Sequence, residues 1–207
     1  MNKIVCSIVF AFSISSCLVS QDIQSSSTGF SVSAAFSYST WNSESFFLGD
    51  LAELEPTGIG IKIGAGYGFN ERISVHANYY GLSFKQENEW ETFNITLQTL
   101  SARWTFGATL SKWRPSFEAG LAYGRNKVDP VQFDGFDELE VINSGFGIHL
   151  GGGINYYVTT NIAVHILGDY VFGNFTSTTL SGIEFSPDED VDYTVLNINF
   201  GVRYFFD

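Results

Sequence analysis

The sequence predicts an all-β fold, an eight-stranded antiparallel up-and-down barrel that crosses a membrane. Apolar and polar residues alternate through eight segments of about ten residues or more, and this is the period of side chains along a β-strand. The connections between these segments are alternately long and short, as an up-and-down barrel requires. An export signal precedes the first segment. Together, the three observations are typical of a transmembrane β-barrel.

The N-terminal region has the composition of a secretory signal. Lys3 precedes an apolar stretch from residue 4 to about residue 14, which is too short to cross a bilayer as a helix. We therefore expect residues 1–20 to be a cleaved signal peptide and residues 21–207 to form one barrel domain.

A second way of processing this region is open. Residues 14–17 loosely resemble a lipobox, which would leave Cys17 as a lipidated first residue. Both cysteines, Cys6 and Cys17, lie before Gln21, so cleavage before Gln21 leaves no thiol. Disulfides, thiolate nucleophiles and thiolate metal sites are then excluded.

The eight segments are expected at about residues 29–41, 58–69, 73–85, 93–106, 115–126, 141–158, 162–172 and 196–206. The first alternates apolar residues with serines, and the second alternates isoleucines and aromatic residues with glycines and Lys62. The third alternates aliphatic residues with Ser74, His76 and Asn78. Each of these three strands therefore has one apolar face and one face of small or polar residues.

The fourth segment changes phase. Its apolar residues fall into two sets on opposite faces, Phe93, Ile95 and Leu97 in one and Leu100, Ala102, Trp104 and Phe106 in the other. Two structures would explain this change of phase, a β-bulge near Gln98 or a strand that extends above the membrane.

The last four segments alternate again. The fifth and sixth oppose apolar residues to glycines and a few polar residues, and the seventh does the same although Leu167 and Val171 dilute its polar face. The eighth is apolar at every second position from Leu196 to Phe206. With eight strands the chain can close on itself without leaving an edge strand.

The apolar faces indicate which way the barrel faces. A soluble, lipocalin-like barrel would place its apolar face inside, around a ligand, and its charges outside. Here the second face is mostly Gly, Ser and Asn, which fit a narrow lumen, and the assigned apolar faces carry no charge. Lipid outside and polar groups inside is the assignment that these residues favour.

The phase of the strands also places the charged residues. The residues predicted to point into the lumen are Lys62, His76, Arg103, Glu118, His149, His165, Asp169 and Arg203. Charges are costly in hydrocarbon, so they should be paired inside the barrel. A lumen of eight strands is just wide enough to be filled by side chains, so this luminal polar network should form a plug.

The formal net charge of -12 argues against binding to nucleic acid. Seventeen of the 22 acidic residues lie in the four long connections, at about residues 41–56, 86–92, 128–141 and 182–193. The short connections are nearly uncharged or basic. We expect the acidic connections to face the outside of the cell and the short turns to face the periplasm.

The strand pattern, the signal and the aromatic end Tyr204-Phe205-Phe206 resemble the small eight-stranded outer-membrane barrels of Gram-negative bacteria, the OmpA- and OmpX-like group. Pro115, Phe117 and the run from Gly120 to Gly124 also look like the fifth strand of this group. The resemblance covers about residue 28 to the end of the chain. It implies location in the cell outer membrane.

The resemblance also implies partners. In this group an aromatic end, with apolar residues at alternate positions before it, is recognised by the barrel-assembly machinery, and Phe200, Val202, Tyr204 and Phe206 match that assembly signal. Outer-membrane lipid and lipopolysaccharide would surround the barrel. The extracellular ligand is not specified by the sequence, because members of this group differ widely in function.

We expect no catalysis, no cofactor and no metal site. The three histidines with Asp169 and Glu118 could form a metal site or an acid–base pair, but inward polar groups are the ordinary filling of such barrels. The predicted function is an integral outer-membrane barrel whose acidic loops serve adhesion, surface properties or envelope integrity. The alternatives are a narrow pore or transporter component and an outer-membrane lipid-modifying enzyme.

Overall fold

The computed structural model describes residues 25–43, 57–84, 93–131, 139–180, 182–186 and 191–206. Its strands are β1 (Gly29–Asn42), β2 (Thr57–Gly68), β3 (Ile73–Phe84), β4 (Phe93–Thr105), β5 (Trp113–Val131), β6 (Leu139–Tyr157), β7 (Ile162–Phe175), β8 (Ser177–Leu180), β9 (Ile183–Phe185) and β10 (Val191–Phe205). No helix among the described residues is long and apolar enough to cross a membrane.

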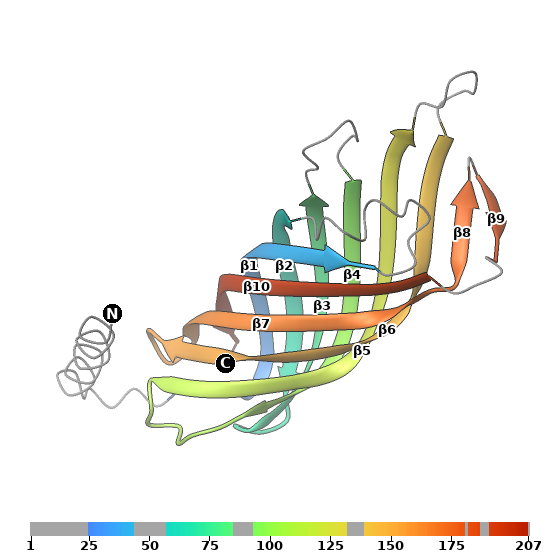
Figure 1. Cartoon of the computed structure of the whole chain (residues 1–207). Coiled ribbons are helices and arrows are strands. Elements are labelled where there is room, and N and C mark those ends of the chain that lie inside the picture. The colour runs from blue at the N-terminus through green and yellow to red at the C-terminus, as the bar shows by residue number, and fades with distance from the viewer. Residues whose placement is uncertain are drawn as a thin grey trace, which may run out of the picture.

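Eight of the strands close into an antiparallel barrel (Figure 1). Their order is β5-β4-β3-β2-β1-β10-β7-β6, and the pairing of β5 with β6 completes the wall. The prediction of an eight-stranded up-and-down barrel is therefore confirmed. The predicted signal peptide at residues 1–20, Cys17 and most of the acidic connections lie outside the described residues.

The two ends of the barrel differ in their connections. The short turns after β2, β4 and β6 lie at one end, called here the turn side, and the long connections after β1, β3, β5 and β7 lie at the other, called the loop side. On the loop side the chain leaves β7 at Thr176, whose N–H donates to the carbonyl of Ser144 on β6. From there β8 pairs with the end of β6, and β9 pairs with β8. This small hairpin, which the sequence did not predict, stands at the loop side in Figure 1.

The predicted bulge near Gln98 is wrong. β4 pairs residue for residue with β3 and with β5, from Phe93 to Thr105, without a shift of register. Ile95 and Leu97 are both 0% exposed because they point into the lumen, where they join an apolar cluster on the loop side. The change of phase in the sequence therefore has no counterpart in the backbone, because the strand continues regularly. It marks the point where the side chains that fill the lumen change from polar to apolar.

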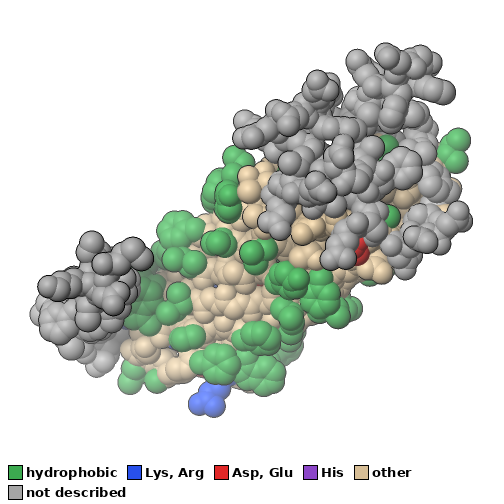
Figure 2. Space-filling model, in the orientation of Figure 1, with side chains coloured by type: hydrophobic (Ala, Val, Ile, Leu, Met, Phe, Trp, Pro, Cys, Tyr) green, Lys and Arg blue, Asp and Glu red, His purple; other side chains and the backbone are tan. Residues whose placement is uncertain are grey.

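The outer wall of the barrel is apolar over most of its height. Large hydrophobic side chains on every strand of the wall are exposed, among them Phe30, Ile61, Leu121, Phe146 and Phe200. On the visible face, green hydrophobic side chains are spread between the ends of the barrel, among tan backbone and other side chains (Figure 2). Such an exposed belt on a closed strand wall is what a lipid environment requires, because each strand of the wall pairs with a neighbour on both sides.

The segment before β1 lies across the turn-side end of the barrel. The N–H of Ser25 donates to the carbonyl of Thr109 at 2.9 Å, and the N–H of Ser26 donates to the carbonyl of Thr160 at 3.1 Å. The hydroxyl of Ser27 donates to the carboxylate of Glu71 at 2.7 Å. These three acceptors belong to the three short turns, so the segment ties the turns together.

Candidate functional site

The luminal polar network is centred on Asp169 of β7. Its Oδ2 accepts hydrogen bonds from Lys62 Nζ at 2.9 Å, Tyr80 O–H at 2.6 Å and Asn199 Nδ2 at 2.8 Å. Its Oδ1 lies 3.0 Å from Nε2 of His149. The donors come from β2, β3, β10 and β6, so one buried carboxylate links strands from around the wall. Lys62 is 1% exposed, and this ion pair is therefore far from bulk water.

Glu118 of β5 forms the second centre of the network. It pairs with the guanidinium of Arg103, which lies opposite it on β4, and accepts a hydrogen bond from the hydroxyl of Ser101 at 3.2 Å. Both charged residues are buried. Each of the two luminal carboxylates predicted from the sequence thus has a basic partner.

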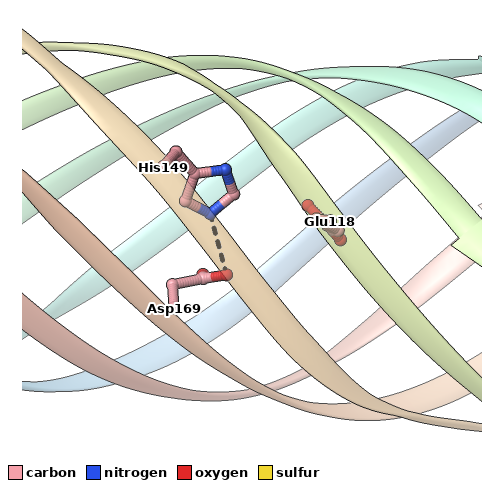
Figure 3. Close-up of side chains that lie close together, drawn as sticks. All are labelled: Glu118, His149 and Asp169. Carbon is pink, nitrogen blue, oxygen red and sulfur yellow. Dashed lines mark hydrogen bonds and ion pairs between the residues drawn. The ribbon is translucent and has the colours of Figure 1, made fainter.

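Glu118, His149 and Asp169 come together in the lumen, and Figure 3 shows them converging from β5, β6 and β7. One nitrogen or oxygen atom from each lies within 4.8 Å of the others, which is close enough to hold a metal ion. Lys62 and Arg103 already neutralise the two carboxylates. A divalent ion would have to displace these cations, so the arrangement favours an ion-pair network over metal binding.

The remaining predicted luminal residues lie nearer the turn side. His76 and the hydroxyl of Ser74 share a hydrogen bond of 2.8 Å. His165 and Arg203 are buried on neighbouring strands and have no carboxylate partner among the described residues. The structure therefore brings His149 into the Asp169 centre but leaves His76 and His165 outside it.

A further ion pair, which the sequence reasoning missed, closes the turn side. Arg114 is 0% exposed, and its Nη1 donates to Glu71 Oε2 at 3.1 Å and to Ser27 Oγ at 3.1 Å. Its guanidinium also lies over the ring of Tyr157, 5.7 Å from the ring centre. Arg114 precedes Glu118 by four residues and so shares its inward face. This spacing in the sequence could have placed Arg114 in the lumen, but the strand was expected to begin only at residue 115.

An apolar cluster fills the lumen on the loop side. Its buried side chains come from six strands, and they are Trp41, Tyr80, Leu82, Phe84, Ile95, Leu97, Ala122, Val128, Val171, Phe175, Tyr193 and Val195. Phe175 and Tyr193 stack with ring centres 4.4 Å apart. Tyr80 belongs to both regions, because its ring packs in the cluster and its hydroxyl bonds to Asp169.

Inward glycines make room for these side chains. A Cβ atom at Gly66 would collide with the ring of His76, and one at Gly151 would collide with the carboxylate of Asp169. The glycines on the polar faces therefore have a packing role, and the space they leave is occupied by the network.

The residues predicted as an assembly signal lie on the outer face of the closing strand. Phe200, Val202, Tyr204 and Phe206 alternate along the end of the chain, and each is between 42% and 59% exposed. Their recognition by an assembly machinery stays a prediction.

Comparisons with known proteins agree with this architecture. The family model "Outer membrane protein beta-barrel domain" matches residues 8–204. No curated protein sequence matches the chain. Among solved structures, Neisserial surface protein A (NspA) is similar with a TM-score of 0.61 and 21% identity, covering 86% of this chain and 98% of that one.

Two other bacterial barrels share the fold. OprG of Pseudomonas aeruginosa has a TM-score of 0.55 and 14% identity, covering 88% of this chain and 98% of its own. Ail of Yersinia pestis, the attachment invasion locus protein, has a TM-score of 0.50 and 14% identity, covering 86% of this chain and 99% of its own. The closed eight-stranded wall, the apolar exterior and the family match lead to one conclusion: this chain belongs to the family of outer-membrane β-barrel domains.

Proposed function

We propose that this protein is a closed, non-catalytic barrel that displays acidic loops at the cell surface, with a role in adhesion or envelope integrity. The single observation that supports this best is the filled lumen. The ion pairs of Asp169 and Glu118 occupy its middle, and the apolar cluster occupies its loop side. Because side chains of the described residues fill the lumen in this way, we expect solutes not to pass, and the function would then lie in what the barrel displays.

The turn side supports the same view. A polar space between Glu71, His76, Arg103 and Arg203 has a volume of about 10 Å³. This is about the smallest volume that can hold one water molecule. A continuous aqueous path along the lumen would need far more space than this.

A narrow pore is the second candidate, and electrical recording distinguishes it. The purified, refolded protein should give no stable channels in planar bilayers beyond those of an empty preparation carried through the same purification. Large and reproducible channels that survive purification would contradict the plug and favour the pore.

A lipid-modifying enzyme is the third candidate. Such an enzyme needs its catalytic histidine to reach the lipid face, whereas His76, His149 and His165 are all buried inside the wall. The geometry therefore argues against catalysis at the lipid surface.

The surface role rests on the orientation of the barrel and can be tested by labelling. Cysteines introduced at Glu53 and Glu189 should react with an impermeant reagent on intact cells, and a cysteine at Asn161 should react only after lysis. The opposite pattern would overturn the orientation. The fold relative Ail is the attachment invasion locus protein of Yersinia pestis, and its name supports an adhesive role for a barrel of this fold.

The loops themselves can be tested in cells. Replacing Asp188, Glu189 and Asp190 with Asn, Gln and Asn should change cell attachment or resistance to detergent while leaving the amount of folded barrel unchanged. A strain lacking the protein shows the largest change in attachment and detergent resistance that the loop variant could cause. If that strain attaches and resists detergent as the parent does, the proposed role is wrong.

A further inference from the structure

The lumen holds one more cation than its carboxylates pair. Among the described residues, four basic side chains are buried there, Lys62, Arg103, Arg114 and Arg203. The first three pair in turn with the carboxylates of Asp169, Glu118 and Glu71. Arg203 is the cation left over within this part of the chain, even when every histidine is counted as neutral.

The guanidinium of Arg203 is buried with hydrogen-bond donors unused. The residue is 2% exposed, and neither its Nε nor its Nη2 has a hydrogen-bond partner among the described residues. A guanidinium has five N–H donors and no acceptor, so only an acceptor can satisfy these groups. A buried charge without a partner is costly, because it has left water and gained nothing in exchange. Arg203 therefore favours the uptake of a negative charge beside it.

A second guanidinium borders the same space. Arg103 pairs with Glu118, but its buried Nη1 has no hydrogen-bond partner among the residues that the structure describes. Arg103 and Arg203 both line the polar space of about 10 Å³ on the turn side. Two cations that face one small space repel each other unless negative charge lies between them. The space thus has the electrostatic character of an anion site.

The other groups around this space are compatible with an anion. The hydroxyl of Ser31 and the imidazole of His76 line it, and both side chains can donate hydrogen bonds. Glu71 lines it as well, but Arg114 already neutralises that carboxylate. The exposed Arg72 adds positive charge at the rim. Because an exposed residue forms part of the lining, the space reaches the turn-side surface, and an ion can enter from there.

The size of the space restricts which anion fits. A volume of about 10 Å³ is room for one small particle. Phosphate, sulfate and carboxylates consist of several heavy atoms and need far more room. Chloride is a single atom, somewhat larger than a water molecule, and it accepts hydrogen bonds from guanidinium and hydroxyl groups. The volume and the donors together favour a halide.

We propose that Arg103 and Arg203 bind one chloride ion in this space. The ion balances the charge of Arg203 and accepts hydrogen bonds from both guanidiniums. It completes the plug on the turn side, where the described chain supplies a cation without a carboxylate. A single water molecule is the alternative occupant, but it would leave the charge of Arg203 uncompensated.

The test measures urea unfolding of the barrel in lipid vesicles while chloride replaces gluconate at constant total salt. Gluconate is too large for the space and keeps the ionic strength unchanged. A ligand that binds only the folded state stabilises it according to its occupancy. Chloride at about ten times its dissociation constant should therefore raise the ratio of folded to unfolded protein about 11-fold. The same ratio in both salts would overturn the proposal.

Two variants distinguish a site from a general effect of the salt. Arg203→Met removes the cation that needs the ion and should abolish the chloride dependence. Lys62→Met makes the same change of charge at a cation that Asp169 pairs, so it should lose stability but keep the chloride dependence of the parent. Equal chloride dependence in the two variants would contradict a site at Arg203.

A fixed carboxylate should take the place of the ion. Ser31 lines the space, so Ser31→Asp puts a negative charge where the chloride is proposed. This variant should be more stable than the parent in gluconate and indifferent to chloride. Ser31→Asn, the matched control, has nearly the same shape without the charge and should be less stable than Ser31→Asp in either salt. The reverse order would show that Arg203 needs no anion.

The ion can also be located directly in the parent protein. Bromide binds as chloride does and has an anomalous X-ray signal. Crystals of the barrel grown in sodium bromide should show an anomalous peak between the guanidiniums of Arg103 and Arg203. A water molecule at that place, with no bromide peak, would overturn the assignment. None of these measurements depends on adhesion or conductance, so this proposal and the proposed function can fail separately.

Discussion

The turn-side and loop-side parts of β4 and β5 have opposite patterns. On β4 the turn-side part exposes Leu100 and Trp104 and buries Ser101 and Arg103. Its loop-side part buries Ile95 and Leu97, and its outward positions are Asn94, Thr96 and Gln98. The first is the pattern of a wall in lipid, and the second is that of an ordinary soluble protein.

β5 shows the same inversion. Phe117 and Leu121 point outward in its turn-side part, with Glu118 inside, whereas Arg125 and Lys127 point outward in its loop-side part, with Val128 inside. These strands keep one register, but their polar residues change from the inner face to the outer face. Such an exchange is expected where a strand leaves lipid and enters water. We infer that the loop-side ends of β4 and β5 stand above the hydrocarbon, and that the apolar cluster is the core of this projecting part.

The largest expected loss of stability follows from a change at the buried charges of the lumen. Glu118→Ala leaves the buried guanidinium of Arg103 without its partner, and should lower the free energy of unfolding by about 3 to 5 kcal/mol. The measurement is urea unfolding of the barrel in lipid vesicles. Glu184→Ala, at an exposed position on β9, is the control and should change the free energy by less than about 0.5 kcal/mol. Equal, small effects would place Glu118 in contact with water.

The boundary between the two parts can be tested from the outside. Leu100→Arg should cost about 2 to 4 kcal/mol in a bilayer, because it places a charge in hydrocarbon, while Thr96→Arg should cost about 0 to 1 kcal/mol. Both positions face outward on the same strand, four residues apart. Unfolding in vesicles measures both costs, and similar values for the two would remove the proposed boundary.

Tyr80 connects the apolar cluster to the Asp169 centre, and its replacement should cause a smaller loss of stability. Tyr80→Phe keeps the ring in the apolar cluster but removes the hydroxyl that donates to Asp169. A hydrogen bond to a charged group contributes about 1.5 to 3 kcal/mol, so the loss should fall in this range. A double variant with Lys62→Met would show coupling if the two donors act on the same carboxylate. Strictly additive losses would argue that they do not.

The smallest effect is expected within the apolar cluster. Ile95→Val removes one buried methylene and should cost about 0.5 to 1.5 kcal/mol, with no dependence on salt. Ile61→Val removes the same group from the lipid-facing wall and serves as the control, because lipid can fill the space it leaves. A larger loss at Ile61 would show that the wall, and not the lumen, is the tightly packed region.

Strand periodicity was sufficient to predict the closed wall and the outward apolar face, because each depends on the alternation of neighbouring residues. The same alternation placed Lys62 and Asp169 on inward faces, where the structure pairs them. Periodicity could not tell which inward residues meet, since that depends on register across the strands. The contact of Lys62 with Asp169 joins residues 107 positions apart.

The phase change of β4 and the start of β5 were predicted less well. The sequence left two explanations for Ile95 and Leu97, a bulge and a strand that extends above the membrane, and the regular register excludes the bulge. Arg114 was placed in a turn because the strand was expected to start after it. Alternation alone does not show which solvent surrounds a part of a strand, nor where the strand begins.

The seam between β1 and β10 has a consequence for the timing of folding. It pairs the first and last strands of the wall, and the hydroxyl of Ser37 donates across it to Asn199, 162 residues away, at 2.5 Å. Contacts between such distant residues form slowly, since a long loop must close first. Lys62 on β2 and Tyr80 on β3 reach Asp169 on β7 across the lumen, so closing the seam is what brings these two donors to that carboxylate. A barrel caught before closure would carry an incompletely paired charge, which gives the chain a reason to finish the seam before it is fully surrounded by lipid.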